Sequence, residues 1–205
     1  MILNQSEIEA LLKDVEAWLS GHFLLTSGMH SNQYIQCQRI MQYPRHGIML
    51  AEALASKVIE AGMMPMTVIG PALGAVHFEV YVAHALDKHH AESPVRGIFA
   101  ERPDGKKFEI RRGIELIPGE PVLVLEDVTT TGGSAMQVVE LVKELGAKPV
   151  AVGTIIDRSG GKIDFGVPFY SLVQMDLAAY KPDECPLCKD GIPLVKPGSS
   201  KQRVS

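Results

Sequence analysis

Residues 122–134 read Val122-Leu123-Val124-Leu125-Glu126-Asp127-Val128-Thr129-Thr130-Thr131-Gly132-Gly133-Ser134. The apolar run at 122–125 predicts a buried β-strand, and the residues after Gly132 have the apolar spacing of a helix, over 133–145. An acidic pair ends the strand, and a loop of Thr, Gly and Ser leads into the helix. The stretch therefore predicts a strand joined to a helix N-terminus by a short polar loop.

The same alternation extends to both sides of this stretch. Strand-like runs at 67–69 and 150–156 flank it, and a further helix-length segment lies at 75–86. Apolar residues in these runs are continuous rather than alternating, which is typical of a parallel sheet covered on both faces. The sequence predicts an α/β fold, with a mostly parallel twisted sheet flanked by helices.

Two helices are expected before this core. The first begins at a capping box formed by Ser6 and Glu9 and ends at Gly21, and the second spans 45–61. The polar segment between them, 27–38, is expected to be a loop.

Length and composition exclude several classes of protein. The chain has 205 residues, 46% hydrophobic and 21% charged, so collagen-like, coiled-coil and wholly disordered readings do not apply. The formal charge of −4 argues against a dedicated nucleic-acid binder. No signal-peptide pattern and no apolar run of ~18 residues is present, and three cysteines are too few for a disulfide framework. We expect a soluble cytoplasmic protein.

The loop after the acidic pair has the features of a phosphate-binding site. Gly132 and Gly133 allow close approach of a ligand to the backbone, and the N–H groups and dipole of a helix start attract an anion. Glu126 and Asp127 can accept hydrogen bonds from a pair of vicinal hydroxyls, so the combination predicts a sugar phosphate. The Walker A and Gly-x-Gly-x-x-Gly patterns are both absent. A capping pair followed by a plain turn would explain each residue but not their combination.

A basic segment lies between the predicted helix at 75–86 and the central strand. Residues 96–112 carry a formal charge of +3, while the rest of the chain carries −7. Pro103, Asp104 and Gly105 interrupt weak β alternation here, which predicts a hairpin or a long mobile loop. Such a loop suits a polyanionic ligand, although a solvated hairpin without a role has the same composition.

The motif at 125–134 resembles the phosphoribosyl-pyrophosphate (PRPP) signature of type I phosphoribosyltransferases. Further segments resemble the orotate phosphoribosyltransferases, and the last two resemble a bacterial branch of them. In chain order these are Gly21 to Tyr34, Gly70 to Ala75, Asp157 to Gly161, Cys185-Pro186-Leu187-Cys188 and Lys196 to Ser199. The resemblance implies a type I phosphoribosyltransferase-like core with a small N-terminal hood. We expect one domain over 1–180, with the hood formed by about 1–45 and by C-terminal residues, and a C-terminal tail at 181–205 that contains the Cys-x-x-Cys pair.

The resemblance also implies roles for individual residues. Glu126 and Asp127 would hold the ribose hydroxyls of PRPP. Residues around its 5-phosphate would be Val128, Thr129, Thr130, Thr131, Gly132, Gly133 and Ser134. Thr130 and Arg158 would contact orotate, and Tyr34 and Ile35 would flank its ring. Read without the resemblance, Arg158 could form a surface ion pair with Asp157 or Asp164, and Tyr34 could be a packed surface aromatic.

The implied reaction is Mg²⁺-dependent transfer of phosphoribose from PRPP to orotate, giving orotidine 5′-phosphate and pyrophosphate in pyrimidine biosynthesis. The ion would be held through PRPP, and no protein residue is assigned as its direct ligand. In this family the mobile loop closes over the active site of the neighbouring subunit, which implies a homodimer. Arg102 and Lys106, with Lys107 next, are the candidates to neutralise pyrophosphate, and Asp127 would face the cationic sugar. Two alternatives remain, a purine-base phosphoribosyltransferase and a regulator that senses PRPP or a nucleotide without turnover.

Two positions depart from the resemblance. Many orotate enzymes have lysine where this chain has Thr26 and Gly74, which we interpret as a trait of the subgroup; His30 could replace part of the lost charge.

The pair Cys185 and Cys188 has the spacing of half a zinc site. Zinc would need partners from a scattered set, namely Cys37, His22, His30, His77 and His84. A redox pair and a plain turn are the other interpretations.

Overall fold

The computed structural model describes residues 3–25, 27–90 and 93–197. Its larger sheet has five strands in the order β4-β3-β5-β6-β7, and every neighbouring pair is parallel. The strands are β3 (Thr67–Pro71), β4 (Arg96–Ala100), β5 (Pro121–Thr129), β6 (Lys148–Asp157) and β7 (Phe169–Gln174). The prediction of an α/β fold with a mostly parallel sheet is confirmed.

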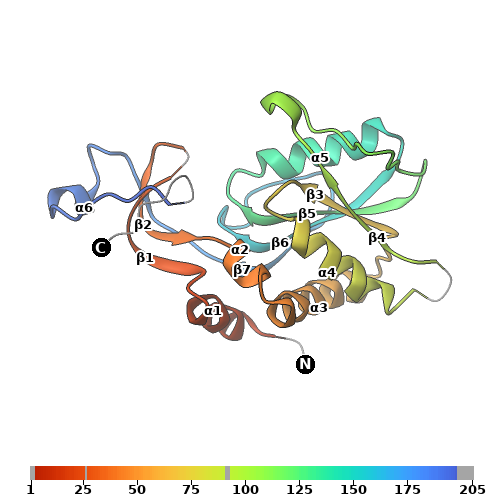
Figure 1. Ribbon diagram of the computed structural model, residues 1–205, viewed down its shortest axis with the longest axis horizontal. Helices are drawn as coiled ribbons and strands as arrows, with labels where there is room; N and C mark the ends of the chain where they lie inside the picture. Colours follow the sequence, from red (N-terminus) through yellow and green to blue (C-terminus); the bar gives the residue numbers. More distant parts are fainter. Residues whose placement is uncertain (1–2, 26, 91–92, 198–205) are drawn as a thin grey trace.

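Helices cover both faces of this sheet (Figure 1). α3 (Pro44–Glu60) and α4 (Val76–Asp87) pack on one face, and α5 (Gly133–Glu144) packs on the other. Their bounds lie within one residue of the predicted ones.

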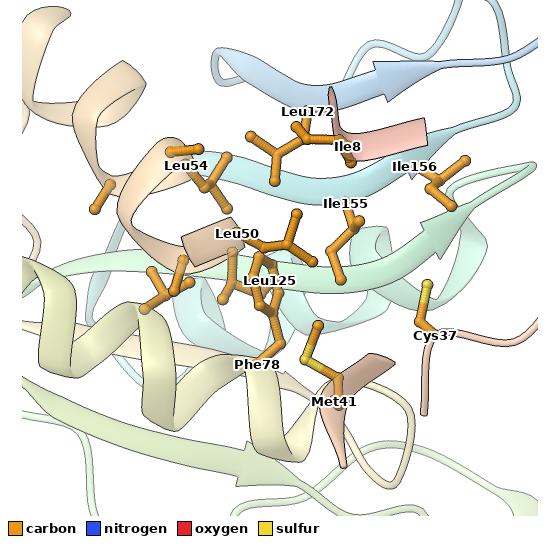
Figure 2. Close-up of a cluster of buried hydrophobic side chains, with 14 of the residues drawn as sticks. Ile8, Cys37, Met41, Leu50, Leu54, Phe78, Leu125, Ile155, Ile156 and Leu172 are labelled. Carbon is orange, nitrogen blue, oxygen red and sulfur yellow. The ribbon is translucent and has the colours of Figure 1, made fainter. Parts of the chain in front are cut away.

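The apolar run of β5 explains why the strand is central. All four residues from Val122 to Leu125 are fully buried. Successive side chains of a strand point to opposite faces. Leu123 and Leu125 accordingly belong to the core cluster with α3 and α4, and Val122 and Val124 to the cluster with α5. Figure 2 shows Leu125 beside Leu50 and Phe78 in the first cluster.

The N-terminal region differs from its prediction. α1 spans Gln5–Asp14, and its capping box is Asn4 with Glu7 rather than Ser6 with Glu9. Glu16 has a left-handed backbone (φ 52°), which ends the helical path, and Trp18–Leu24 forms strand β1. The predicted helix up to Gly21 was therefore too long.

The segment predicted as a polar loop contains strand β2 (His30–Ile35). It pairs antiparallel with β1 and with β8 (Ala179–Tyr180), giving a small sheet of order β1-β2-β8. This sheet is the hood, which lies beside the main sheet in Figure 1. Polar residues dominate β2 although none of them is exposed, and His30 and Ser31 are buried, so its sequence lacks the pattern of a core strand.

The C-terminal segment returns to the hood. After the short helix α6 (Pro186–Lys189), the chain runs along β1, where Val195 N–H donates to His22 O and Leu24 N–H donates to Val195 O, both at 2.8 Å. Another short helix, α2 (Gln38–Met41), connects the hood to α3, and the 3₁₀ turn η1 spans Pro103–Gly105. Among the described residues, no helix has the length and apolar character needed to cross a bilayer.

Candidate active site

The polar loop after β5 forms the cradle that the sequence predicts. Gly132 is the N-cap of α5 and has a left-handed backbone (φ 74°), which favours glycine. A Cβ at Gly132 would lie 2.9 Å from Ile163 Cγ2 and 3.0 Å from Phe165 Cζ, so space also excludes a side chain. The loop thereby turns tightly and presents the first N–H groups of α5, which attract an anion.

The acidic pair lies beside this helix start. Burial and the neighbouring Asp127 raise the pKa of Glu126 to about 7, against opposing hydrogen bonds from Thr129, Ala135 and Ser134. Burial also raises the pKa of Asp127, although Val128 N–H donates to Asp127 Oδ1 at 2.9 Å. Two half-buried carboxyls with raised pKa values are typical of a functional site, because their charge lacks full compensation from the protein.

Two cavities meet at Asp127. The larger one, about 960 Å³, lies between the hood and the ends of β5 and β6. It is lined by Leu24, Leu25, Ser27, Gly28, Tyr34, Ile35, Gln36, Cys37, Gln38, Asp127, Val128, Thr130, Thr131, Arg158, Lys196 and Pro197. The smaller one, about 260 Å³, is lined by Pro71, Ala72, Gly74, Arg102, Phe108, Glu126, Asp127 and Ser134. All four residues expected to contact the base thus line the larger cavity.

Arg158 is one of the residues that line the larger cavity. Its backbone N–H donates to Thr129 O at 2.8 Å, which fixes its position beside the cradle, and burial lowers its pKa. Within the described residues Nε has no partner, and no ion pair joins Arg158 to Asp157 or Asp164. Asp157 instead accepts hydrogen bonds from Ser159 (2.6 and 2.7 Å) and Gly161 (2.8 Å). The surface ion pair is therefore absent from the described structure.

Tyr34 both packs against another aromatic ring and lines the larger cavity, which are the two environments considered from the sequence. Its ring packs against Phe23 at 5.7 Å between centroids, and it also lines the larger cavity. Burial, Asp127 and Cys37 raise the pKa of its hydroxyl, which stays protonated as a hydrogen-bond donor.

Ion pairs remove much of the charge of the basic segment. Arg96 pairs with the buried Glu120 at 2.7 Å, and Glu101 pairs with Arg112 at 2.7 Å and with Arg111 at 3.9 Å. An antiparallel bridge between Glu101 and Glu109 closes the loop into a hairpin.

Three cations of this hairpin have no such ion pair with a described side chain, namely Arg102, Lys106 and Lys107. Arg102 stacks over Phe108 (4.1 Å to the centroid) and donates to Gln137 Oε1 on α5 at 2.9 Å. It therefore faces the smaller cavity of its own chain. Lys106 and Lys107 are exposed beyond η1.

Several residues that line the larger cavity were not predicted as site residues from the sequence, and two of them carry functional side chains. Lys196 and Gln38 line the larger cavity, and only the Lys-Pro pair of the tail motif pointed towards the first. Gly74 lies against the acidic pair, where a Cβ would approach Asp127 Oδ1 to 3.0 Å, so a larger residue would crowd that carboxylate. Thr26, the other departure, is outside the described residues.

The cysteine pair is not among the residues that line either cavity, and α6, which contains Cys188, lies on the side of the hood away from the main sheet in Figure 1. Cys185 and Cys188 meet His22 and His30 there. His77 and His84 lie on α4, and Cys37 lies by Asp127, so none of these three joins the group. His30 faces the cysteines and is not among the cavity-lining residues.

Parallel strands, an acidic pair at a strand end and an anion cradle at a helix start define an α/β protein that binds a sugar phosphate. Comparison with known proteins identifies it further. A family model described as "Phosphoribosyl transferase domain" matches residues 42–178. The orotate phosphoribosyltransferase of Thermotoga maritima is 49% identical over 94% of this chain and 97% of its own. That of Caldanaerobacter subterraneus is 47% identical over 97% of this chain and 100% of its own. The chain belongs to the phosphoribosyltransferase family, in its orotate phosphoribosyltransferase branch.

Solved structures show the same fold at lower identity. Orotate phosphoribosyltransferase from Aeropyrum pernix has a TM-score of 0.65 at 23% identity, covering 82% of this chain and 93% of its own. Adenine phosphoribosyltransferase from Thermoanaerobacter pseudethanolicus has a TM-score of 0.57 at 17% identity, over 70% of this chain and 88% of its own. The fold is thus shared by enzymes named for different bases, and it does not by itself choose the base.

Proposed function

We propose that this chain transfers phosphoribose from PRPP to orotate, releasing pyrophosphate and forming orotidine 5′-phosphate for pyrimidine biosynthesis. One observation carries the proposal: Asp127 borders both the cavity that contains Arg158 and the cavity that contains Arg102. A sugar bound at Asp127 would have a planar anionic base on one side and pyrophosphate on the other. The high identity to two enzymes named for orotate supports the choice of base.

The residues of the cradle and the acidic pair hold the ribose phosphate. The N–H groups at the start of α5 and the hydroxyls of Thr130 and Thr131 bind the 5-phosphate, and Glu126 and Asp127 accept hydrogen bonds from the ribose hydroxyls. As the bond from C1 to pyrophosphate breaks and the bond to the ring nitrogen of orotate forms, positive charge develops on the sugar. The two carboxylates stabilise that charge.

Orotate is held in the larger cavity. Its carboxylate matches the fork of N–H donors on Arg158, whose Nε has no protein partner in the described structure. Thr130 contacts the polar edge of the ring, and Tyr34 and Ile35 flank it.

Mg²⁺ suits the donor set on the other side of Asp127. Carboxylate and phosphate oxygens are its preferred ligands, and here Glu126, Asp127 and the pyrophosphate of PRPP would supply them. When bound, the ion would neutralise charge on the leaving group. Arg102 adds a cation from the same chain, since it lines the same cavity as Glu126.

Lys106 is proposed to act across a homodimer, where the hairpin of one subunit closes over the pyrophosphate of its neighbour and excludes water. Its exposure on the turn beyond η1 leaves it able to reach another chain. We further propose that residues 1–180 form the catalytic domain and that 181–205 form a tail, whose described part pairs with β1 of the hood through Val195. The cytoplasmic location remains a prediction from the sequence.

The test of the reaction is the loss of orotate absorbance when the purified protein is mixed with PRPP and Mg²⁺. Adenine, xanthine and uracil are run in parallel. Turnover with orotate alone supports the assignment. Turnover with adenine or xanthine would instead identify a purine-base phosphoribosyltransferase. Binding of PRPP without turnover of any base would indicate a sensor.

The role of the hairpin is tested by Lys106→Ala, with Lys148→Ala as the control, an exposed lysine at the start of β6 that is not among the residues lining either cavity. We expect Lys106→Ala to lower kcat at least 100-fold with a small change in the dissociation constant of PRPP, because the lysine stabilises charge that develops during bond breaking. Equal losses in kcat and in PRPP affinity would contradict a transition-state role.

A further inference from the structure

Four potential metal ligands from distant parts of the chain meet on the hood. His22 lies on β1 and His30 on β2, Cys185 is the N-cap of α6, and Cys188 lies within α6. One ligand atom from each lies within 4.8 Å of the others. The proposed transferase reaction uses none of these side chains.

Four of the six separations between these ligand atoms are close to those of a tetrahedral zinc site. Sulfur at about 2.3 Å and nitrogen at about 2.0–2.1 Å from one zinc ion, arranged tetrahedrally, lie about 3.3–3.8 Å from one another. His22 Nε2 is 3.5 Å from Cys185 Sγ and 3.7 Å from Cys188 Sγ. His30 Nδ1 is 3.3 Å from Cys188 Sγ and 3.0 Å from His22 Nε2. These four separations need shifts of only a few tenths of an ångström to enclose an ion.

A hydrogen bond outside the cluster orients His22 for coordination. Its Nδ1 lies 2.7 Å from the carbonyl oxygen of Ile192, and because a carbonyl only accepts, Nδ1 carries the proton. The lone pair of His22 is therefore on Nε2, the atom that faces both sulfurs. Histidine ligands of zinc are commonly held in this way by a backbone carbonyl.

Burial favours a metal over an unoccupied polar cluster. His22 is 2% exposed, His30 is 5% exposed and Cys185 is fully buried, while Cys188 closes the exposed side. Two thiolates and two neutral imidazoles around Zn²⁺ carry no net charge, which avoids the cost of burying an isolated ion. Four protein ligands leave no open position, as in structural rather than catalytic sites.

We propose that His22, His30, Cys185 and Cys188 bind one structural Zn²⁺, through Nε2, Nδ1 and the two thiolates. The ion joins β1 and β2 of the hood to the C-terminal segment. That segment continues from α6 to Val195, which pairs with β1, and then to Lys196 and Pro197, which line the larger cavity. Zinc thereby fixes the part of the tail that forms one wall of the substrate cavity.

The experiment measures the zinc content of the full chain by inductively coupled plasma mass spectrometry, on protein purified without a metal-affinity step. We expect one zinc per chain, retained in Cys37→Ala and His84→Ala, whose side chains lie outside the cluster. Cys188→Ser and His30→Ala should lose at least nine-tenths of it. Fewer than about 0.1 zinc ions per chain, in wild-type protein from cells grown with added zinc, would overturn the proposal.

A second measurement does not depend on the folding of variants. Wild-type protein is unfolded and refolded with Co²⁺ in place of Zn²⁺, and its absorption spectrum is recorded. Tetrahedral coordination with two thiolates predicts intense sulfur-to-cobalt bands in the near ultraviolet and d–d bands between about 600 and 750 nm. Absence of these bands from refolded, active protein, or a Cys185–Cys188 disulfide in protein kept under reducing conditions, would contradict a metal site.

Discussion

Glu79 on α4 is a buried carboxyl whose ionisation should control the pH dependence of stability. It is 1% exposed, and its Oε1 has no hydrogen-bond partner among the described residues. It lies against the end of β3, since a Cβ on Gly70 in that strand would come within 2.6 Å of this oxygen. Burial raises the pKa of Glu79 from 4.5 to about 9, against a weaker opposing hydrogen bond from the Gly70 backbone.

The magnitude follows from the linkage between protonation and folding. Below pH 4.5 the carboxyl is neutral in both the folded and the unfolded chain, so its contribution to stability is fully present. As the pH rises towards 9 the unfolded chain loses the proton and the folded chain keeps it, which lowers the free energy of unfolding by about 1.4 kcal/mol per pH unit. Between pH 5 and pH 7 the loss amounts to about 3 kcal/mol.

Glu79→Gln replaces the ionisable carboxyl by a neutral amide of nearly the same shape, so the side chain no longer titrates. Relative to wild type, the variant should gain about 3 kcal/mol in free energy of unfolding between pH 5 and pH 7. Urea unfolding at pH 5, 6 and 7 measures it, with Glu60→Gln, an exposed carboxyl on α3, as the control for the loss of one charge. If wild type and Glu79→Gln show the same dependence on pH, the carboxyl is ionised in the folded protein and the reasoning is refuted.

Three further predictions concern the site and the core. Burial and Asp127 raise the pKa of Glu126 to about 7, so the affinity for PRPP should fall several-fold as the pH drops from 7.5 to 6. Calorimetry at several pH values measures this, and the affinity of Glu126→Gln should depend less on pH. The same pH dependence in wild type and variant would contradict the prediction. Arg158→Ala should raise KM for orotate about 10-fold to 100-fold through loss of charge-assisted hydrogen bonds, while the dissociation constant of PRPP stays within about threefold; equal effects on both would place Arg158 outside the base site. Gly47→Ala should lower the free energy of unfolding by about 1–3 kcal/mol, despite the better helix propensity of alanine, because the new Cβ would lie 2.3 Å from the Tyr81 ring; an unchanged urea midpoint would show that the ring moves aside.

The main sheet could be predicted from the sequence because its signals are local. Val122–Leu125 is apolar on both faces, and a helix pattern follows within ten residues. The hood could not be predicted in the same way. Strand β1 has a burial pattern that changes along its length, with a register shift between Ser20 and Phe23, and β2 is rich in polar side chains. Such strands form because other segments pair with them, a long-range effect that local patterns do not encode.

The functional residues show the same difference between local and long-range features. The cradle and the acidic pair lie within nine residues of sequence, so their chemistry was visible as one motif. The metal cluster needed His22 and Cys185, which are 163 residues apart, and the sequence left their partners open among several histidines. For the metal cluster, the sequence spacing identified the two cysteines, and the fold showed which two histidines lie beside them.

The distribution of charge around the larger cavity connects the tail to the proposed reaction. At position 74, where related enzymes are expected to carry lysine, a Cβ would already lie 3.0 Å from Asp127 Oδ1, and this chain has glycine. Two cationic side chains nevertheless line the larger cavity, Arg158 from the end of β6 and Lys196 from the tail. Lys196 directly follows Val195, which pairs with the backbone of His22 and Leu24. The segment that binds the proposed zinc ion on one side of the hood therefore delivers a positive charge to the substrate cavity on the other, and loss of the metal should weaken the binding of an anionic substrate as well as the attachment of the tail.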